Sequence, residues 1–308
     1  MFHELLQINP EVAEAIITNE PVVVLESTLI SHGMPYPENL ETARIIEETI
    51  RSLGAIPATI ALHGGRIHIG TSDSLMEELA HSPQTMKASR SDIALVLSKK
   101  LTASTTVAAT MFCAHLAGLS IFVTGGIGGV HQHVIENFDI SADLIELSTT
   151  PVTVVCSGAK SILDLPKTLE KLESYGVPVV GYRTNEFPAF YSHSSGLPLV
   201  HRLDEPQEIA DLLHYQHQLG MRNGVVVANP IPRVAEIPEA QIKPVIEQAR
   251  EEAKGLQGKS ITPFLLQRIN ELTAGESLRA NIELIRNNAL LGAQIAVCYY
   301  QALKHLSR

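Results

Sequence analysis

Short apolar runs alternate with helical patterns along nearly the whole chain, and this alternation limits the possible folds more than any other feature. Runs that are apolar on both faces are typical of strands in a mainly parallel sheet covered by helices. The order therefore predicts one domain over residues 1–308, an α/β fold with three α/β/α layers around a mixed, mostly parallel sheet. The runs lie at Val22–Glu26, Ala58–Leu62, Ile121–Thr124, Val152–Cys156, Val177–Tyr182 and Val225–Asn229.

Turn and cap signals mark the ends of several elements. Ser104 or Thr105 is predicted to cap a helix over Val107–Ala117, and Thr262 to cap a helix that starts at the next proline. The glycine-flanked segment Gly64–Gly70 is typical of a hairpin arm, so at least one antiparallel pair is expected.

Composition argues against two classes of partner. The 33 acidic and 23 basic residues give a formal net charge of -10, and the sequence has no Lys/Arg cluster on which nucleic-acid binding could rest. No stretch approaches the roughly 18 consecutive apolar residues of a membrane span. Cys113, Cys156 and Cys298 are far apart and lie in apolar runs, which favours buried free thiols in a reducing, cytoplasmic environment.

Lys160 follows the apolar run Val152–Cys156, at the end of a predicted strand. Gly158 permits a sharp turn there, and the helical pattern over Ser161–Leu172 predicts Lys160 at or just before a helix N-terminus, whether or not Pro166 divides that helix into a short turn and a longer second piece. The positive end of a helix dipole disfavours a cation, so this position favours the neutral amine that imine chemistry needs. A surface lysine whose stem lies on the sheet edge explains this segment equally well.

Other unusual residues also follow predicted strands, the edge at which α/β sheets bind ligands. Glu26 ends the first run, and four glycines within Gly125–Gly129 allow close backbone approach to a ligand or a phosphate. A flexible loop is the alternative explanation for the glycines. Lys87 forms a compact cationic group with Arg90 and is a candidate phosphate contact, with a solvated turn as its alternative.

Asp139 is the candidate metal ligand. A carboxylate without nearby cysteine suits a hydrated hard cation such as Mn²⁺ or Mg²⁺. His131 and His133 would suggest zinc together with Asp139, but their spacing on a glycine-rich loop defines no geometry. Ser141 as a helix N-cap and Asp143 in the first turn have a sufficient structural explanation.

Five segments occur in an order that matches a known pattern: Leu25–Pro35, Gly125–His131, Phe138–Asp143, Cys156–Leu165 and Val227–Pro232. They resemble the pseudouridine-5′-phosphate glycosidases, also called the indigoidine synthase A family, and the resemblance runs from about Leu5 to the last predicted helix. It implies a homotrimer of α/β/α subunits that reversibly cleaves the C–C glycosidic bond of pseudouridine 5′-phosphate, giving uracil and ribose 5-phosphate in pseudouridine catabolism. By convention the activity, also named pseudouridylate synthase, is classed with the carbon–oxygen hydro-lyases.

Matched motif by motif, the resemblance implies roles for individual residues. Lys160 matches the covalent lysine and Glu26 the proton donor, while Asp139 matches the aspartate that holds a divalent metal, usually Mn²⁺. The matched substrate contacts are Lys87, Val107, Ser141, Ala142 and Asp143, and further lining residues are Thr124, His131 and Asn281. Gln132-His133 departs from the His-Arg expected after the glycine run, and Ala88 and Ser91 differ from the residues expected around Lys87, which puts peripheral contacts in doubt.

One lysine and one glutamate suit a carbon-linked base. Ordinary glycosidases use two carboxylates because their leaving atom accepts a proton, whereas uracil joined through carbon leaves poorly. An amine that opens the ribose and forms an imine at C1′ lets the base depart as its C5 is protonated.

Two other classes of protein fit the same layers. A sugar or nucleoside kinase needs a nucleotide-phosphate loop and a catalytic aspartate near the C-terminus, where Ala274–Glu276 is the nearest segment and lacks the aspartate. A sugar-phosphate sensor needs a DNA-binding or partner module, for which no segment is left over. Release of uracil without ATP separates these classes.

Overall fold

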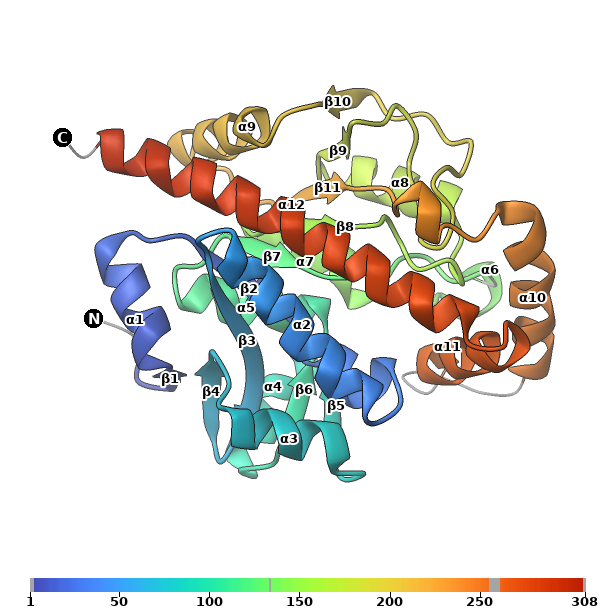
Figure 1. The fold of residues 1–308 in the computed structure, drawn as a ribbon, viewed down its shortest axis with the longest axis horizontal. Coiled ribbons are helices and arrows are strands. Elements are labelled where there is room, and N and C mark those ends of the chain that lie inside the picture. The colour runs from blue at the N-terminus through green and yellow to red at the C-terminus, as the bar shows by residue number, and fades with distance from the viewer. Residues whose placement is uncertain (1–2, 133, 255–260, 307–308) are drawn as a thin grey trace.

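A sheet of eleven strands forms the centre of the computed structural model, which describes residues 3–132, 134–254 and 261–306 (Figure 1). The strands are β1 (Leu6–Ile8), β2 (Val22–Leu25), β3 (Ile56–His63), β4 (Arg66–Ile69), β5 (Met86–Ala88), β6 (Ala103–Thr105), β7 (Ile121–Val123), β8 (Thr153–Cys156), β9 (Val179–Tyr182), β10 (His201–Leu203) and β11 (Val225–Ala228). Their order is β1-β4-β3-β2-β7-β8-β11-β9-β10, and β6 pairs with both β3 and β5. β3 pairs antiparallel with β4 and β6, and the other pairs are parallel, so the mixed, mostly parallel sheet is confirmed.

Helices cover both faces of the sheet. They are α1 (Pro10–Thr18), the π-helix η1 (Leu29–Gly33), α2 (Glu38–Ser52), α3 (Asp73–His81), η2 (Arg90–Asp92), α4 (Ile93–Ser98), α5 (Val107–Leu116), α6 (Val134–Asn137), α7 (Ala142–Thr149), α8 (Leu165–Ser174), α9 (Pro206–Gln218), η3 (Arg233–Ala235), α10 (Glu239–Glu252), α11 (Ile261–Leu272) and α12 (Glu276–Leu306). α12 packs beside α2 and α9 and crosses β2, β7 and β8, whereas α5 and α7 pack together on the opposite face (Figure 1). In the described ranges, no helix combines the length and the apolar character needed to cross a membrane.

The predicted apolar runs form the core. Val22–Val24, Val154, Val155 and Val225–Val227 are fully buried, because helices cover both faces of these strands. All three cysteines are free, as predicted; Cys113 and Cys156 are buried, but Cys298 is only partly buried. Burial raises the pKa of the Cys113 and Cys156 thiols to about 12, which makes them poor nucleophiles.

Two predicted helix caps are wrong by one or two residues. Ser104 and Thr105 belong to β6, so the first hydroxyl available to α5 is that of Thr106, which accepts the Ala109 N–H. α11 begins at Ile261, and Thr262 therefore lies inside the helix rather than at its cap. The predicted hairpin arm is confirmed, with His63 paired to Arg66 across the β3–β4 turn.

The prediction that Lys160 lies at a helix N-terminus is also wrong. α8 begins five residues later, with Asp164 as its N-cap and Pro166 in its first turn. The intervening backbone pairs with the glycine-rich segment instead: the Lys160 N–H donates to Ile127 O at 3.1 Å and the Asp164 N–H to Val130 O at 2.9 Å. The dipole of α8 therefore does not explain a neutral amine at Lys160.

Candidate active site

A cavity at the carboxyl ends of β2 and β7 brings together five of the predicted site residues: Glu26, Lys87, Thr124, Lys160 and Asn281. Its volume of about 50 Å³ has room for a few waters and not for a nucleotide. A larger cavity of about 540 Å³ adjoins it and shares four lining residues, His32, Gly33, Leu266 and Asn281. We call these two spaces the catalytic cavity and the outer cavity.

Glu26 directly follows β2, and two threonines fix its carboxylate. Thr28 donates its hydroxyl to Oε2, and Thr124, which follows β7, donates to Oε1. Each oxygen accepts one neutral hydroxyl, and Glu26 lines the catalytic cavity. This arrangement suits a group that gives and takes protons.

Lys160 is half-buried and lines the same cavity. Within the described ranges its ammonium has no ion pair, whereas its backbone is held by Ile127. Asn288 of α12 supports these strand ends: its side-chain amide donates to Thr124 O at 2.9 Å and to Ser157 Oγ at 3.2 Å. The ends of β7 and β8, which lead to Thr124 and to Lys160, are therefore both hydrogen-bonded to α12.

The glycine run is closely packed, so the interpretation of it as a flexible loop is wrong. A Cβ added at Gly128 would lie 2.2 Å from Ser141 Oγ, one added at Gly129 2.4 Å from Thr168 Oγ1, and one added at Gly126 2.7 Å from the Phe190 ring. Real Cβ atoms do not approach other atoms so closely. The glycines are required because α7, α8 and the segment around Phe190 press against this backbone.

Four predicted substrate contacts do not line the catalytic cavity, namely Val107, Ser141, Ala142 and Asp143. Val107 and Asp143 are buried, with exposed fractions of 1% and 6%, and Ala142 faces outward. Asp143 accepts the Ala108 N–H at 2.9 Å and the Gly128 N–H at 2.8 Å, and Ser141 caps α7 as predicted. These residues join α5, α7 and the glycine run, and their contact with a substrate stays a prediction.

His131 and Asp139 lie side by side near Lys160. His131 Nδ1 is 3.9 Å from Asp139 Oδ2, and the His131 N–H donates to Asp139 O at 3.0 Å. Burial lowers the pKa of His131, the positive charges of Lys160 and Arg250 lower it further, and Asp139 opposes them. The two predicted site residues therefore belong to one electrostatic neighbourhood with Lys160.

The donor set at Asp139 fits a hydrated hard cation. Across residues 3–132, 134–254 and 261–306, no three His, Cys, Asp or Glu side chains come together as a metal cage. The Asp139 carboxylate is about one-third exposed, so a cation bound there would keep most of its coordination sphere for water, as Mn²⁺ and Mg²⁺ do. His133, the second histidine of the zinc alternative, lies outside the described residues.

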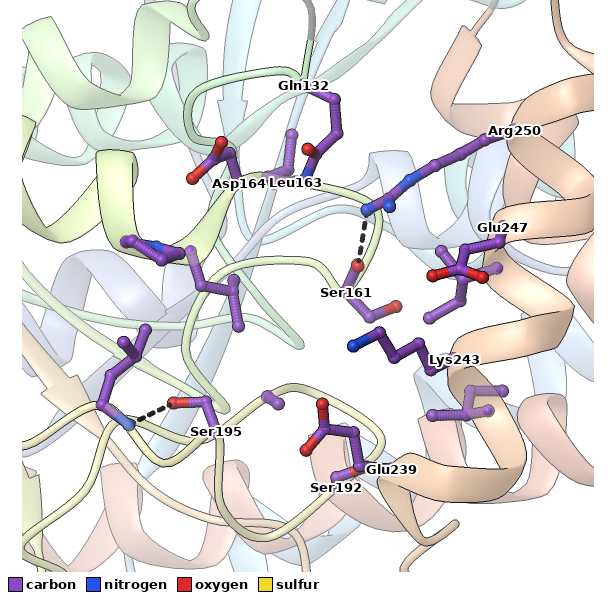
Figure 2. Close-up of a pocket in the computed structure, with 16 residues that line it drawn as sticks. Gln132, Ser161, Leu163, Asp164, Ser192, Ser195, Glu239, Lys243, Glu247 and Arg250 are labelled. Carbon is purple, nitrogen blue, oxygen red and sulfur yellow. Dashed lines mark hydrogen bonds between the residues drawn. The ribbon is translucent and has the colours of Figure 1, made fainter.

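A further cavity of about 420 Å³ is lined by Ser161, the residue that follows Lys160 (Figure 2). Arg250 of α10 reaches across it and donates Nη2 to Ser161 O at 3.3 Å, while Gln132 and Lys243 also point into it (Figure 2). Gln132 is one of the departures from the family pattern noted in the sequence. Arg250 thus places a second cation beside the backbone of the residue that follows Lys160.

Sequence reasoning missed several residues of the catalytic cavity, among them Thr28, His32 and Phe190. Thr28 and His32 lie in a segment quoted only as a family motif, and no periodicity signals the π-helix that turns His32 inward. Phe190 takes a left-handed backbone conformation, with φ of 65°, and donates its N–H to Ser157 O at 3.2 Å. Nothing in its local sequence predicts that conformation.

Lys160, Glu26 and Lys87 surround one cavity at the strand ends of a mostly parallel α/β sheet. This arrangement defines an α/β enzyme with an amine-bearing active site. The model of the family described as indigoidine synthase A like protein matches residues 11–298, and the chain belongs to this family.

Named relatives cover the same length. The chain is 65% identical over 303 residues to the pseudouridine-5′-phosphate glycosidase of Legionella pneumophila, covering 98% of each chain. It is 54% identical to that of Caldanaerobacter subterraneus, covering 96% of this chain and 97% of the relative. A crystal structure of the prealnumycin C-glycosynthase AlnA in complex with ribulose 5-phosphate is 34% identical and superposes with a TM-score of 0.91, covering 98% of this chain and 99% of that one.

Proposed function

We propose that this protein is a pseudouridine-5′-phosphate glycosidase, which converts pseudouridine 5′-phosphate and water into uracil and ribose 5-phosphate. The observation that carries the proposal is the presence of Lys160 and Glu26 in one cavity of a chain 65% identical to a protein of that name. The solved C-glycosynthase relative holds a pentulose phosphate, which supports a phosphorylated pentose as the ligand class.

Lys160 is the proposed nucleophile. Its Nζ bonds to C1′ of the opened ribose; when the C1′–C5 bond breaks, the bonding pair goes to the pyrimidine, which takes a proton at C5, and the nitrogen pair forms the imine. Water then hydrolyses the imine, which releases ribose 5-phosphate and returns the amine. Lys87 lines the same cavity and supplies a positive charge nearby.

Glu26 is the proposed proton donor. Opening the ribose requires a proton on the ring oxygen, and release of the base requires one on C5. The Thr28 and Thr124 hydroxyls hold both carboxyl oxygens in place while leaving the carboxyl group on the cavity wall.

Asp139 is the proposed ligand of a hydrated divalent cation, Mn²⁺ or a similar ion. When bound, such an ion supplies positive charge that stabilises an anionic substrate. The backbone hydrogen bond from the His131 N–H to Asp139 O holds Asp139 beside the end of the glycine run.

The first experiment is direct. The purified protein, pseudouridine 5′-phosphate and Mn²⁺ without ATP should release uracil and ribose 5-phosphate in equal amounts, measured by chromatography. A requirement for ATP would favour a kinase, and absence of uracil would contradict the proposal.

The second experiment tests the covalent step. Borohydride added with ribose 5-phosphate alone should reduce an imine and leave a pentose-phosphate adduct on the peptide that contains Ser157–Ser161, located by mass spectrometry. Lys160→Ala should form no adduct and lose activity, and Lys160→Arg should not restore it because a guanidinium stays protonated. An adduct on another lysine would contradict this assignment.

We propose a homotrimer, as the family resemblance implies, and classification among the carbon–oxygen lyases. A cytoplasmic location is proposed because the three cysteines are free thiols.

A further inference from the structure

His32 occupies the boundary between the two cavities. It is the fourth residue of η1, and the π-helix that follows Glu26 brings its ring to the walls of both the catalytic and the outer cavity. Single-turn π-helices occur disproportionately at functional sites, because the extra residue re-aims a side chain.

Two serine hydroxyls surround Nδ1 of His32. Ser31 Oγ lies 2.6 Å from Nδ1 and Ser104 Oγ lies 3.4 Å from it. Ser31 donates its hydroxyl proton to Ser27 O at 3.5 Å, and Ser104 donates its own to Met86 O at 3.2 Å. Ser27 O and Met86 O can take the two hydroxyl protons, so both serine oxygens can accept from Nδ1 when the imidazole proton is there.

With the imidazole proton on Nδ1, Nε2 carries the lone pair. Within the ranges that the structure describes, no residue makes a hydrogen bond to Nε2, and the ring edge lies on the cavity walls. The surroundings also keep the imidazole uncharged: burial lowers the pKa of His32, and the charge of Lys87 lowers it further. A neutral imidazole with one nitrogen anchored and the other directed at a cavity has the form of a general base.

We infer that His32 is the base that accepts the N1 proton of the pseudouracil ring. The inference rests on the proposed function. It also explains a choice between isomers, because pseudouridine 5′-phosphate has a proton on N1, whereas in uridine 5′-phosphate N1 carries the ribose. Asn281 lines the same two cavities and has a buried Oδ1 without a partner, which leaves a second acceptor for a ring N–H.

Removal of the N1 proton drives ring opening. The N1 electron pair forms N1=C6, the C5=C6 pair forms C5=C1′, and the C1′–O4′ pair leaves on O4′, which takes a proton from Glu26. Addition of Lys160 Nζ to C1′ reverses the shift, and N1 regains its proton from His32. No external oxidant, reductant or further reactant is needed.

The test compares two substrates and two variants. His32→Ala should lower kcat on pseudouridine 5′-phosphate by about 10²–10⁴-fold, the usual contribution of a general base. N1-methylpseudouridine 5′-phosphate has no proton for His32 to remove, so the wild type should turn it over slowly and His32→Ala should cause no comparable further loss. His32→Gln keeps an acceptor but cannot take a proton, so it should retain KM and lose kcat as His32→Ala does.

Two controls separate the possible causes. Borohydride trapping of ribose 5-phosphate by Lys160 does not involve the base, so both His32 variants should trap as well as the wild type, which also shows that they are folded. His68→Gln alters another half-buried histidine whose pKa burial lowers, on β4 and outside both cavity walls, and should leave kcat unchanged.

Equal losses on the two substrates, or loss of trapping, would overturn the inference and place His32 on the pentose-phosphate half. If the wild type neither releases uracil nor forms the adduct, the proposed function itself fails.

Discussion

Single residues around the catalytic cavity are held by neutral hydroxyls. Two threonines donate to the Glu26 carboxylate and two serine hydroxyls lie beside His32 Nδ1, so hydroxyl groups orient both side chains. The positive charges, Lys87 and Lys160, are directed at the space between them.

This arrangement predicts the acid side of the pH profile. Burial and Lys87 lower the pKa of His32, so the ring stays neutral to a lower pH than an ordinary imidazole, and activity that needs the neutral ring falls only as the pH drops through that lowered pKa. The other charged groups on the cavity walls are Glu26, Lys160 and Glu271. In a kcat/KM profile on pseudouridine 5′-phosphate, His32→Gln should remove this limb. A limb that persists unchanged would assign it to another group.

Lys87 should act on the phosphorylated substrate. Lys87→Ala should raise KM for pseudouridine 5′-phosphate by roughly ten- to 150-fold, because a hydrogen bond to a charged group contributes about 1.5–3 kcal/mol. Turnover of unphosphorylated pseudouridine, measured in parallel, should change little. Equal losses on both substrates would make the role of Lys87 structural.

Asp139 should control the metal. Asp139→Ala should abolish stimulation by Mn²⁺ and remove the bound ion seen by electron paramagnetic resonance, while the circular dichroism spectrum stays that of the wild type. Retained Mn²⁺ binding in this variant would move the site to other residues, with His131 the first to test.

At the scale of elements, the six apolar strands and the β4 hairpin arm were predictable, whereas the short strands β1, β5, β6 and β10 were not, and the segments between strands were predictable only in part. Val22–Glu26 and Val152–Cys156 are apolar on both faces because helices cover both, and that burial is visible in the sequence. The cap of α5 was not predictable, because Ser104, Thr105 and Thr106 are all suitable N-cap residues. Only the pairing of β6 with β3 decides among them.

Long-range pairing also explains the error at Lys160. Residues after Gly158 have a helical pattern, but their backbone bonds to Ile127 and Val130, so the helix starts only at Leu165. The candidate site shows the same division. Glu26, Lys87, Thr124, Lys160 and Asn281 share a cavity, whereas His32 was missed because its orientation depends on a π-helix.

The packed glycine run gives a prediction about stability. Gly128→Ala would place a Cβ 2.2 Å from Ser141 Oγ and 2.7 Å from Asp143 Oδ2, which forces the α7 N-terminus away. We expect a loss of about 1–3 kcal/mol in the free energy of unfolding, measured by urea denaturation. Gly33→Ala is the control, because its nearest contact is an ordinary 3.4 Å. Equal free energies of unfolding for Gly128→Ala and the wild type would show that the α7 N-terminus moves away from the glycine run without a measurable cost.

At the scale of the whole molecule, the proposed trimer gives the simplest prediction. Light scattering should give a mass three times the 33.5 kDa of one chain, unchanged on dilution into the working range of the assay. Large apolar side chains are exposed on the described surface, among them Ile135 at 78% and Phe138 at 81%, close to Asp139. A monomeric mass with full activity would exclude a requirement for assembly.

α12 is the last described element of the chain, and it contacts site residues that come much earlier in the sequence. Asn281 completes both cavities, and Asn288 joins the end of β7 to the end of β8. On the ribosome, the strands that carry Glu26 and Lys160 emerge well before α12, whose 31 residues take about 2–6 s to synthesise at 5–20 residues per second. A nascent chain therefore carries Glu26 and Lys160 before the α12 residues that line the cavity and bond to its strand ends have been made.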